Sequence, residues 1–255
     1  MEKSMISEWE VHGNIGVLTI NNPPQNYLEG FKVAHLSDLK RWTHNDSLKG
    51  MIVTGKGRHF CAGFNKEDLF KVTEGTSLLE EIRKSNEIPY YIEQLPIPVV
   101  AAIAGVCFGA GLEIALSCHI KVCSEKALLS FPETGYGILP GLNGAVRLPG
   151  QIGVCRALDL VLAGKIIHGD EALELGIVDY LVPPKEVFEF SLNLLEKMTR
   201  DRPVNIIHSV MKSINNSRRL SFEAAAEEET GLFARLVLAR TNVMHDNEER
   251  GQNNQ

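Results

Sequence analysis

The 255-residue chain has few cysteines, and no two of them form a CxxC pair. An odd number of cysteines without paired spacing argues against a disulfide framework and against a thiolate metal site. Most of them stand among apolar or small residues, so we expect free, buried thiols in a reducing cytosol. The five are Cys61, Cys107, Cys118, Cys123 and Cys155.

Positive charge is also scarce, because 26 Lys and Arg residues face 32 Asp and Glu residues and leave a net charge of −6. Nucleic-acid binding requires a basic face on the protein, so the negative net charge argues against nucleic acids as partners.

The longest apolar stretch, residues 95–116, is interrupted by prolines, glycines and a glutamate, so we expect no membrane span. The N-terminal MEKSMISEWEV is polar and lacks the apolar centre of a signal peptide. We therefore expect a cytoplasmic protein.

Short apolar segments alternate with helical patterns over the first 150 residues. The segments that predict strands are WEVHG with its hairpin partner IGVLTIN, then GMIVTG, PVVAAIAG, HIKVCSE and ALLSF. Helices are expected at residues 31–45, 66–72, 77–95 and 108–118. This alternation is typical of an α/β fold with mostly parallel strands.

The sequence changes character after Gly150, where every apolar segment has helical spacing. The last ten residues, DNEERGQNNQ, are polar and are expected to fray. We therefore expect an α/β core over residues 1–195 and a C-terminal helical region over residues 196–255.

Two glutamates occupy segments that are otherwise apolar or turn-forming. Glu113 interrupts the nearly uncharged residues 99–120, and Glu133 follows ALLSFP. An apolar environment raises the pKa of a carboxyl group toward the range useful for proton transfer near neutral pH. Two such groups could act as an acid/base pair on one small molecule. The alternative is that Glu113 reaches solvent from a helix and Glu133 caps a turn.

Two small-residue turns accompany these glutamates, HFCAGFN (59–65) and VCFGAGLE (106–113). Each is expected to end a strand and start a helix, where unpaired backbone N–H groups favour negative charge. Two N–H groups aimed at one point form an oxyanion hole, which can stabilise a thioester enolate. Small residues also let a substrate carbonyl approach the backbone closely.

Taken in order, these segments resemble the crotonase (enoyl-CoA hydratase/isomerase) superfamily over residues 8–250. The resemblance rests on LTINNPPQN, GMIVTGKGRHFCAG, PVVAAIAGVCFGAGLEIALSC, LSFPETGYGILPGLNGAVRLP, VLAGKIIHGDEALELGIVDYLVP and FEAAAEEE. It implies a crotonase-like spiral of ββα units with a helical C-terminal trimerisation region. It also implies a homotrimer or a dimer of trimers.

The resemblance assigns roles to individual positions. The backbone N–H groups of Phe64 and Ala110 would form the oxyanion hole. Glu113 and Glu133 match the two acid/base glutamates, and Gly141 matches a glycine that helps to position the water. The residues that would contact the acyl-CoA are Ala62, Phe64, Asn65, Lys66 and Ala110.

Glu113 and Glu133 are 20 positions apart, as in the hydratases of this family, whereas its isomerases generally keep only one of the two. The pair therefore implies an enoyl-CoA hydratase, a lyase of fatty acid metabolism that adds water syn across a 2-enoyl thioester. Coenzyme A enters only as part of the substrate. Neither a metal nor a tightly bound cofactor is implied.

The chain also departs from the family pattern. Phe64 and Asn65 replace a usual Ala-Asp pair, while His119 replaces a usual Asp and Asn143 a usual Gly. The usual aromatic and basic ending is absent after Arg250, which predicts weak binding of the nucleotide end of CoA. Three alternatives stay open: a double-bond isomerase, a dehydratase or decarboxylase that acts on an acyl-carrier-protein thioester, and a member that binds thioesters without turnover.

Overall fold

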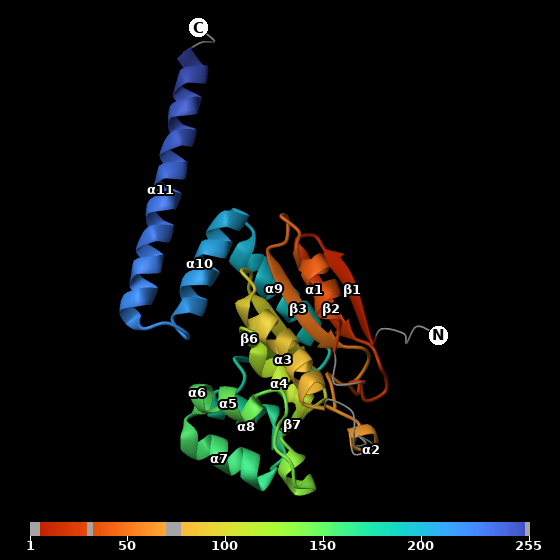
Figure 1. Cartoon of the computed structure of the whole chain (residues 1–255). Coiled ribbons are helices and arrows are strands. Elements are labelled where there is room, and N and C mark those ends of the chain that lie inside the picture. Colours follow the sequence, from red (N-terminus) through yellow and green to blue (C-terminus); the bar gives the residue numbers. More distant parts are fainter. Residues whose placement is uncertain (1–5, 30–32, 70–77, 253–255) are drawn as a thin grey trace. The chain divides into compact units, whose positions relative to one another are not determined.

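The computed structural model describes residues 6–29, 33–69 and 78–252, with the backbone alone for residues 68 and 242–252. Two compact units make up the chain, Met1–Arg200 and Asp201–Gln255, and each is described by itself (Figure 1). The boundary at residue 195, drawn from the sequence, stays a prediction.

A six-stranded sheet forms the centre of the first unit, in the order β1-β2-β3-β4-β6-β9. The β1–β2 pair is an antiparallel hairpin, and every other neighbouring pair is parallel, so the mostly parallel α/β prediction is confirmed. All six residues of β2 are buried, as in a strand covered on both faces. The strands are β1 (Ser7–His12), β2 (Ile15–Ile20), β3 (Gly50–Gly55), β4 (Val99–Ile103), β6 (Ile120–Ser124) and β9 (Tyr180–Val182).

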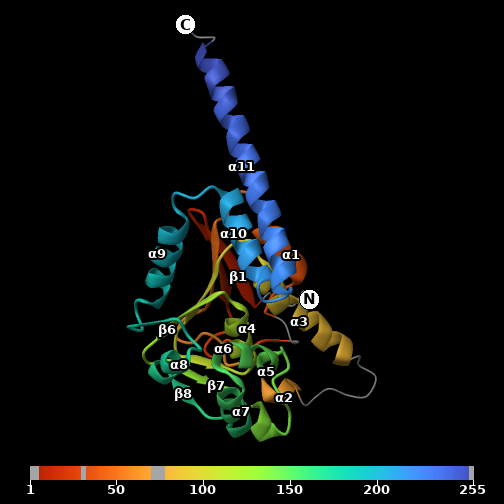
Figure 2. The ribbon, with the colours of Figure 1, turned by 90° about the vertical axis from the view of Figure 1, so that its left-hand side faces the viewer.

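Helices cover this sheet. Helix α9 (Val187–Thr199) packs against β2, β3, β4 and β6 and buries its Val187 and Leu195 among their side chains. Figure 2 shows α9 beside these strands. Helix α4 (Ala110–Ser117) is buried at every residue, as expected of a helix that is apolar all round. Helix α3 (Leu78–Gln94) packs against α4.

A second, three-stranded sheet follows the order β5-β7-β8, with β5 and β7 parallel and β8 antiparallel to β7. Strands β8 and β9 lie beyond Gly150, so the prediction of helices alone in that part was wrong. They have two and three residues, which is too short to show a strand period in the sequence. The new elements are β5 (Val106–Phe108), β7 (Leu128–Ser130), β8 (Ile167–His168), α5 (Gly144–Arg147), α6 (Pro149–Ile152), α7 (Val154–Ala163) and α8 (Gly169–Leu175).

Helix α1 (Leu36–Thr43) begins five residues later than predicted, because His35 before it has extended dihedrals of φ −80° and ψ 134°. Phe31, from which that helix was expected to start, lies outside the described residues. Helix α2 (Lys66–Leu69) covers the first part of the helix expected at 66–72, whose remainder also lies outside them.

The second unit contains α10 (Val204–Asn216) and α11 (Phe222–Gln252). Lys212 Nζ and Glu228 Oε2 form an ion pair between them, 2.9 Å apart. Helix α11 includes most of the tail that was expected to fray, so that prediction was wrong. Glu and Arg are good helix formers, and extending an existing helix costs little free energy. Among the described helices, none has the length and hydrophobicity to cross a membrane.

Candidate active site

Three segments of the first unit meet at the turns singled out in the sequence. Cys61 and Cys107 form a parallel bridge, and the N–H of Phe108 donates to the carbonyl of Cys61 at 3.0 Å. The N–H of Gly109 donates to the carbonyl of Ser130 at 2.9 Å, which joins the start of α4 to β7. The segments that carry Phe64, Ala110 and Glu133 are thus held side by side.

Two glycines allow this close approach. Gly63 has φ +86°, and a Cβ on it would lie 3.3 Å from the backbone nitrogen of Ala110. Gly109 has φ +49°, and a Cβ there would collide with Glu133 Oε1. Both conformations favour glycine, so backbone packs directly on backbone and on the carboxylate.

Glu113 is fully buried within α4. Its Oε1 accepts the N–H groups of Leu142 at 2.8 Å and Gly144 at 2.6 Å, whereas Oε2 is buried and has no hydrogen-bond partner among the described residues. Burial raises the pKa of this carboxyl to about 7, against the lowering effect of the backbone groups of Gly144, Leu142 and Gly141 and of the Arg147 charge. The alternative of a glutamate that reaches solvent is wrong.

Glu133 opens a short 3₁₀ helix, η1 (Glu133–Tyr136), directly after Pro132. Its Oε2 is also buried without a hydrogen-bond partner in the described parts of the chain. Burial and, to a smaller extent, the nearby charge of Glu113 together raise the pKa of Glu133 to about 7. Since the two carboxyls influence each other, they titrate as a pair, and one can hold a proton near pH 7 while the other accepts one.

The remaining residues predicted for the site are Ala110, Phe64 and Gly141. Ala110 is buried at the first position of α4, and helices leave their first N–H groups without intrahelical partners. Phe64 follows Gly63 and forms a bridge with Leu28. Gly141 lies one residue before Leu142, and a Cβ on it would meet open space.

Apart from Ala110 on α4, the residues assigned to the acyl-CoA lie at residues 62–65 and at the start of α2. The N–H of Ala62 donates to the carbonyl of Gln25 at 3.0 Å, and Asn65 Oδ1 accepts the N–H of Glu67 at 2.9 Å. Lys66 Nζ lies 5.7 Å from the ring centre of Tyr136, which is within cation–π range. Lys66 therefore connects α2 to η1 across the site.

The sequence reading missed three residues that border this site. Tyr136 contacts Lys66, and Asn86 and Arg147 bind the loop that holds Glu113. Arg147 donates to both carboxylate oxygens of Glu93, at 2.7 and 3.1 Å, and its side chain is only 10 % exposed. A signal for Arg147 was present, because it is a lone charge within the apolar GLNGAVRLP.

The cysteines are free among the described residues, with Cys155 exposed and the other four buried. Burial raises the pKa of Cys61, which lies two residues before Gly63, to about 12. A thiol that stays protonated at neutral pH is a poor nucleophile. The carboxyls are thus the groups at this site that can transfer protons.

Replacing Glu113 by Gln is expected to stabilise the protein more at pH 8 than at pH 4.5. The folded-state pKa lies near 7, above the ordinary 4.5, so the folded protein binds this proton more tightly than the unfolded chain does. This contribution to stability is complete below pH 4.5 and is lost as the pH rises through 7. Gln does not titrate. Urea unfolding should show the stability difference between variant and wild type widening by about 1–3 kcal/mol between the two pH values; a constant difference would contradict the raised pKa.

Comparisons with known proteins agree with this geometry. A family model described as enoyl-CoA hydratase/isomerase matches residues 10–252. A probable enoyl-CoA hydratase of Bacillus subtilis (strain 168) is 35% identical over 223 residues, which cover 86% of this chain and 85% of that protein. The structure of Pseudomonas aeruginosa DspI has a TM-score of 0.85 at 27% identity and covers 94% of this chain and 98% of its own.

A further solved structure, the enoyl-CoA hydratase of Bacillus anthracis, has a TM-score of 0.83 at 25% identity, with 96% of each chain covered. The fold and the order of the segments therefore agree with the resemblance seen in the sequence. The chain belongs to the enoyl-CoA hydratase/isomerase family of the crotonase superfamily.

Proposed function

We propose that the protein is an enoyl-CoA hydratase that adds water syn across the double bond of a 2-enoyl thioester, or removes it in reverse. The observation that carries this proposal is the pair of carboxyls, Glu113 and Glu133, each with a buried Oε2 that lacks a hydrogen-bond partner among the described residues. Both have a pKa raised to about 7, so they can exchange protons with a substrate at neutral pH.

The N–H groups of Phe64 and Ala110 donate hydrogen bonds to the carbonyl oxygen of the thioester and stabilise the enolate that forms there. A water molecule bound between the two Oε2 atoms adds its oxygen to Cβ and gives a proton to the Glu113 carboxylate. Protonated Glu133 delivers a proton to Cα. The product is a 3-hydroxyacyl thioester. Before the next turnover, proton exchange with solvent removes the proton from Glu113 and returns one to Glu133.

An absorbance assay with crotonyl-CoA tests this function. Hydration removes the conjugation between the double bond and the thioester, so the ultraviolet absorbance of the enoyl group should fall when enzyme is added. A series of longer and branched enoyl-CoA substrates would establish the acyl preference. Absence of hydration throughout the series, with conversion of 3-enoyl to 2-enoyl thioesters instead, would favour a double-bond isomerase.

A carrier-protein thioester is the second candidate substrate, and the position of Lys66 favours it. Lys66 is the cation among the residues assigned to the acyl-CoA, and it could contact a phosphate of CoA. Its ammonium instead lies over the Tyr136 ring. We expect an acyl-CoA to bind less than about tenfold more tightly than the same acyl-pantetheine, or 1.4 kcal/mol. Calorimetry measures both affinities. A much larger difference would show that the protein binds the nucleotide end of CoA strongly and would exclude this reading.

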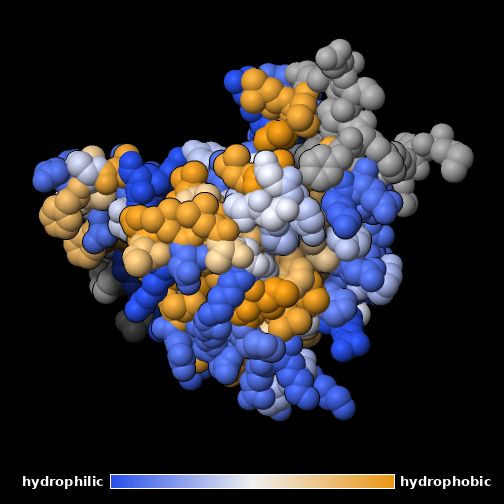
Figure 3. All heavy atoms as spheres, turned by 90° about the horizontal axis from the view of Figure 1, so that it is seen from below, coloured by the Kyte–Doolittle hydropathy of each residue, from blue (hydrophilic) through white to orange (hydrophobic). Residues whose placement is uncertain are grey.

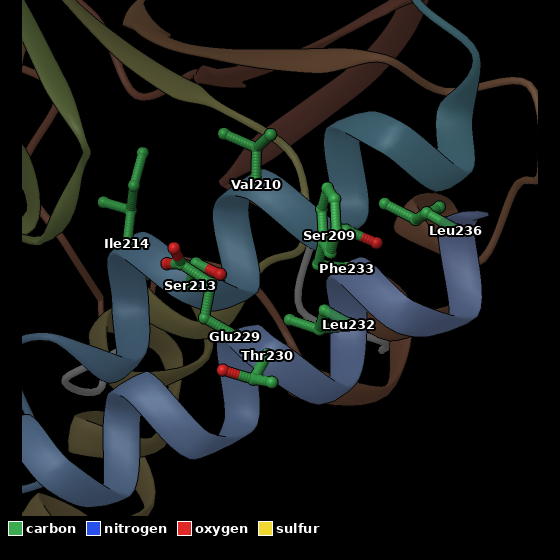
Figure 4. Close-up of a pocket in the computed structure, with 9 residues that line it drawn as sticks. All are labelled: Ser209, Val210, Ser213, Ile214, Glu229, Thr230, Leu232, Phe233 and Leu236. Carbon is green, nitrogen blue, oxygen red and sulfur yellow. The ribbon is translucent and has the colours of Figure 1, made fainter.

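Exposed apolar faces support the assembly of the protein as a homotrimer or a dimer of trimers. Val154, Leu158 and Leu162 lie one helical turn apart on α7 and are 65%, 54% and 69% exposed. Hydrophobic patches are visible on the face of the molecule that is seen from below (Figure 3). In the second unit, α10 and α11 border a groove of about 510 Å³ into which Phe233 faces (Figure 4). Exposed apolar patches of this kind mark interfaces.

Native mass spectrometry should therefore find three or six copies of the chain. Leu162→Asp places a charge on the apolar face of α7 and is expected to shift the population toward smaller assemblies. A wild-type protein that is monomeric at micromolar concentration would contradict the proposed assembly.

A further inference from the structure

Two asparagines, Asn86 and Asn143, connect helix α3 to the loop at residues 141–144, whose N–H groups bind Glu113. Asn143 Nδ2 donates to Asn86 Oδ1 at 2.6 Å. Asn86 Nδ2 in turn donates to the carbonyl of Gly141 at 3.1 Å and to the carbonyl of Ile82, one turn earlier in α3, at 3.0 Å. Asn86 is thus hydrogen-bonded to its own helix and, at Gly141 and Asn143, to the loop.

Asn143 adopts a left-handed backbone conformation, with φ 67° and ψ 28°. Few residues other than glycine do so, although asparagine tolerates it. Its two neighbours are Leu142 and Gly144, whose N–H groups bind Glu113 Oε1. The conformation of Asn143 therefore sets the direction of both donors, and its side chain holds that conformation against α3.

We propose that Asn86 and Asn143 are positioning residues for Glu113. They hold the loop so that the N–H groups of Leu142 and Gly144 donate hydrogen bonds to Oε1 of Glu113. Oε2 is then the oxygen that faces the reacting water. This inference rests on the proposed function for the identity of the reaction, and on the hydrogen bonds alone for the positioning of the carboxyl.

A second attachment keeps the loop in place when the asparagine contact is removed. Arg147 pairs with Glu93 of α3 and donates to the carbonyl of Leu142. The charged groups that face Glu113 are Arg147 from α5, which lowers the pKa of Glu113, and Glu133 from η1, whose own pKa the charge of Glu113 raises. Both stay present in the variants below, so a change in the titration of Glu113 reports on its two N–H donors.

The variants are Asn143→Gly and Asn86→Ala, singly and together. Glycine at 143 keeps the left-handed backbone and removes only the side-chain amide. We expect each single variant to lower kcat by about 10- to 100-fold, the usual cost of a misplaced catalytic group, while KM stays nearly constant. The acidic limb of the pH profile should move to higher pH, because a carboxylate that loses N–H donors is harder to ionise.

The double variant should lose no more activity than the more affected single variant, because either single variant already removes the hydrogen bond between Asn143 and Asn86. Arg83→Ala is the matched control, since Arg83 also lies on α3 but pairs with the exposed Glu80. It should leave kcat, KM and the pH profile unchanged. Unchanged kcat and pH profile in both asparagine variants would overturn the proposal, and so would fully additive losses.

A titration of Glu113 separates this inference from the proposed function. Carbon-13 NMR of protein labelled at the glutamate carboxyls, assigned with Glu113→Gln, reports its ionisation without any substrate. The pKa of Glu113 should be higher in Asn143→Gly and Asn86→Ala than in wild type. A shift in a protein without hydratase activity would support the positioning role and reject the proposed reaction. The absence of a shift would reject the positioning role whatever the activity.

Discussion

Replacing Glu133 by Gln is expected to lower kcat for hydration by at least about 10²-fold while KM changes little. The amide has nearly the same shape as the carboxyl, so substrate binding is kept, but it has no acidic proton to give to Cα. Glu133 Oε2 is buried and its pKa is raised to about 7, which allows it to carry that proton at neutral pH. Steady-state kinetics with a 2-enoyl-CoA substrate measure the loss.

Glu113→Gln provides the comparison for this variant. The N–H groups of Leu142 and Gly144 will bind the amide oxygen of the new side chain, which turns its NH₂ group toward the water in place of Oε2. A donor cannot accept the proton of the attacking water, so hydration should fall strongly as well. Unchanged kcat in Glu133→Gln would remove Glu133 from the mechanism. Isomerisation that survives in Glu113→Gln and disappears in Glu133→Gln would favour the isomerase.

Replacing Ala110 by Pro is expected to lower kcat/KM by about 10²- to 10³-fold, because one donor of the oxyanion hole is lost. Ala110 is the first residue of α4, a position where proline fits the helix and where its missing N–H breaks no helical hydrogen bond. The proline therefore removes the donor without interrupting the helix. Kinetics with the same enoyl-CoA substrate measure the loss, and circular dichroism checks the fold.

Ala110→Gly is the matched control, because it keeps the N–H group and removes only a methyl group. It should retain most of the wild-type activity. Equal losses in the two variants, accompanied by equal losses of melting temperature, would mean that the start of α4 affects folding and does not donate a hydrogen bond to the substrate.

The sequence predicted the parts of the fold that depend on local pattern. Buried segments such as the strand GMIVTG and the mostly apolar helix α4 stand out because burial leaves few polar residues in them. Glu113 is conspicuous for the same reason, since it is the one charge in that helix. The short strands β5, β8 and β9 were missed because two or three residues show no period.

The groups that support the site could not be read from the sequence in the same way. Asn86 lies 57 positions before Asn143, and Glu93 lies 54 positions before Arg147. Polar residues on a helix such as α3 usually face solvent, and only the folded chain shows which of them meet the loop around Glu113. The contact of Lys66 with Tyr136 likewise joins two segments that are distant in sequence.

Hydration in water enriched in oxygen-18 tests the central claim most directly, namely that Glu113 and Glu133 together add a water molecule to the double bond. Mass spectrometry of the product from a 2-enoyl-CoA should show a 3-hydroxyacyl thioester that carries one heavy oxygen, formed by wild type and nearly absent with either Glu→Gln variant. An unlabelled product with a shifted double bond, or labelled product formed equally well without Glu133, would contradict the account.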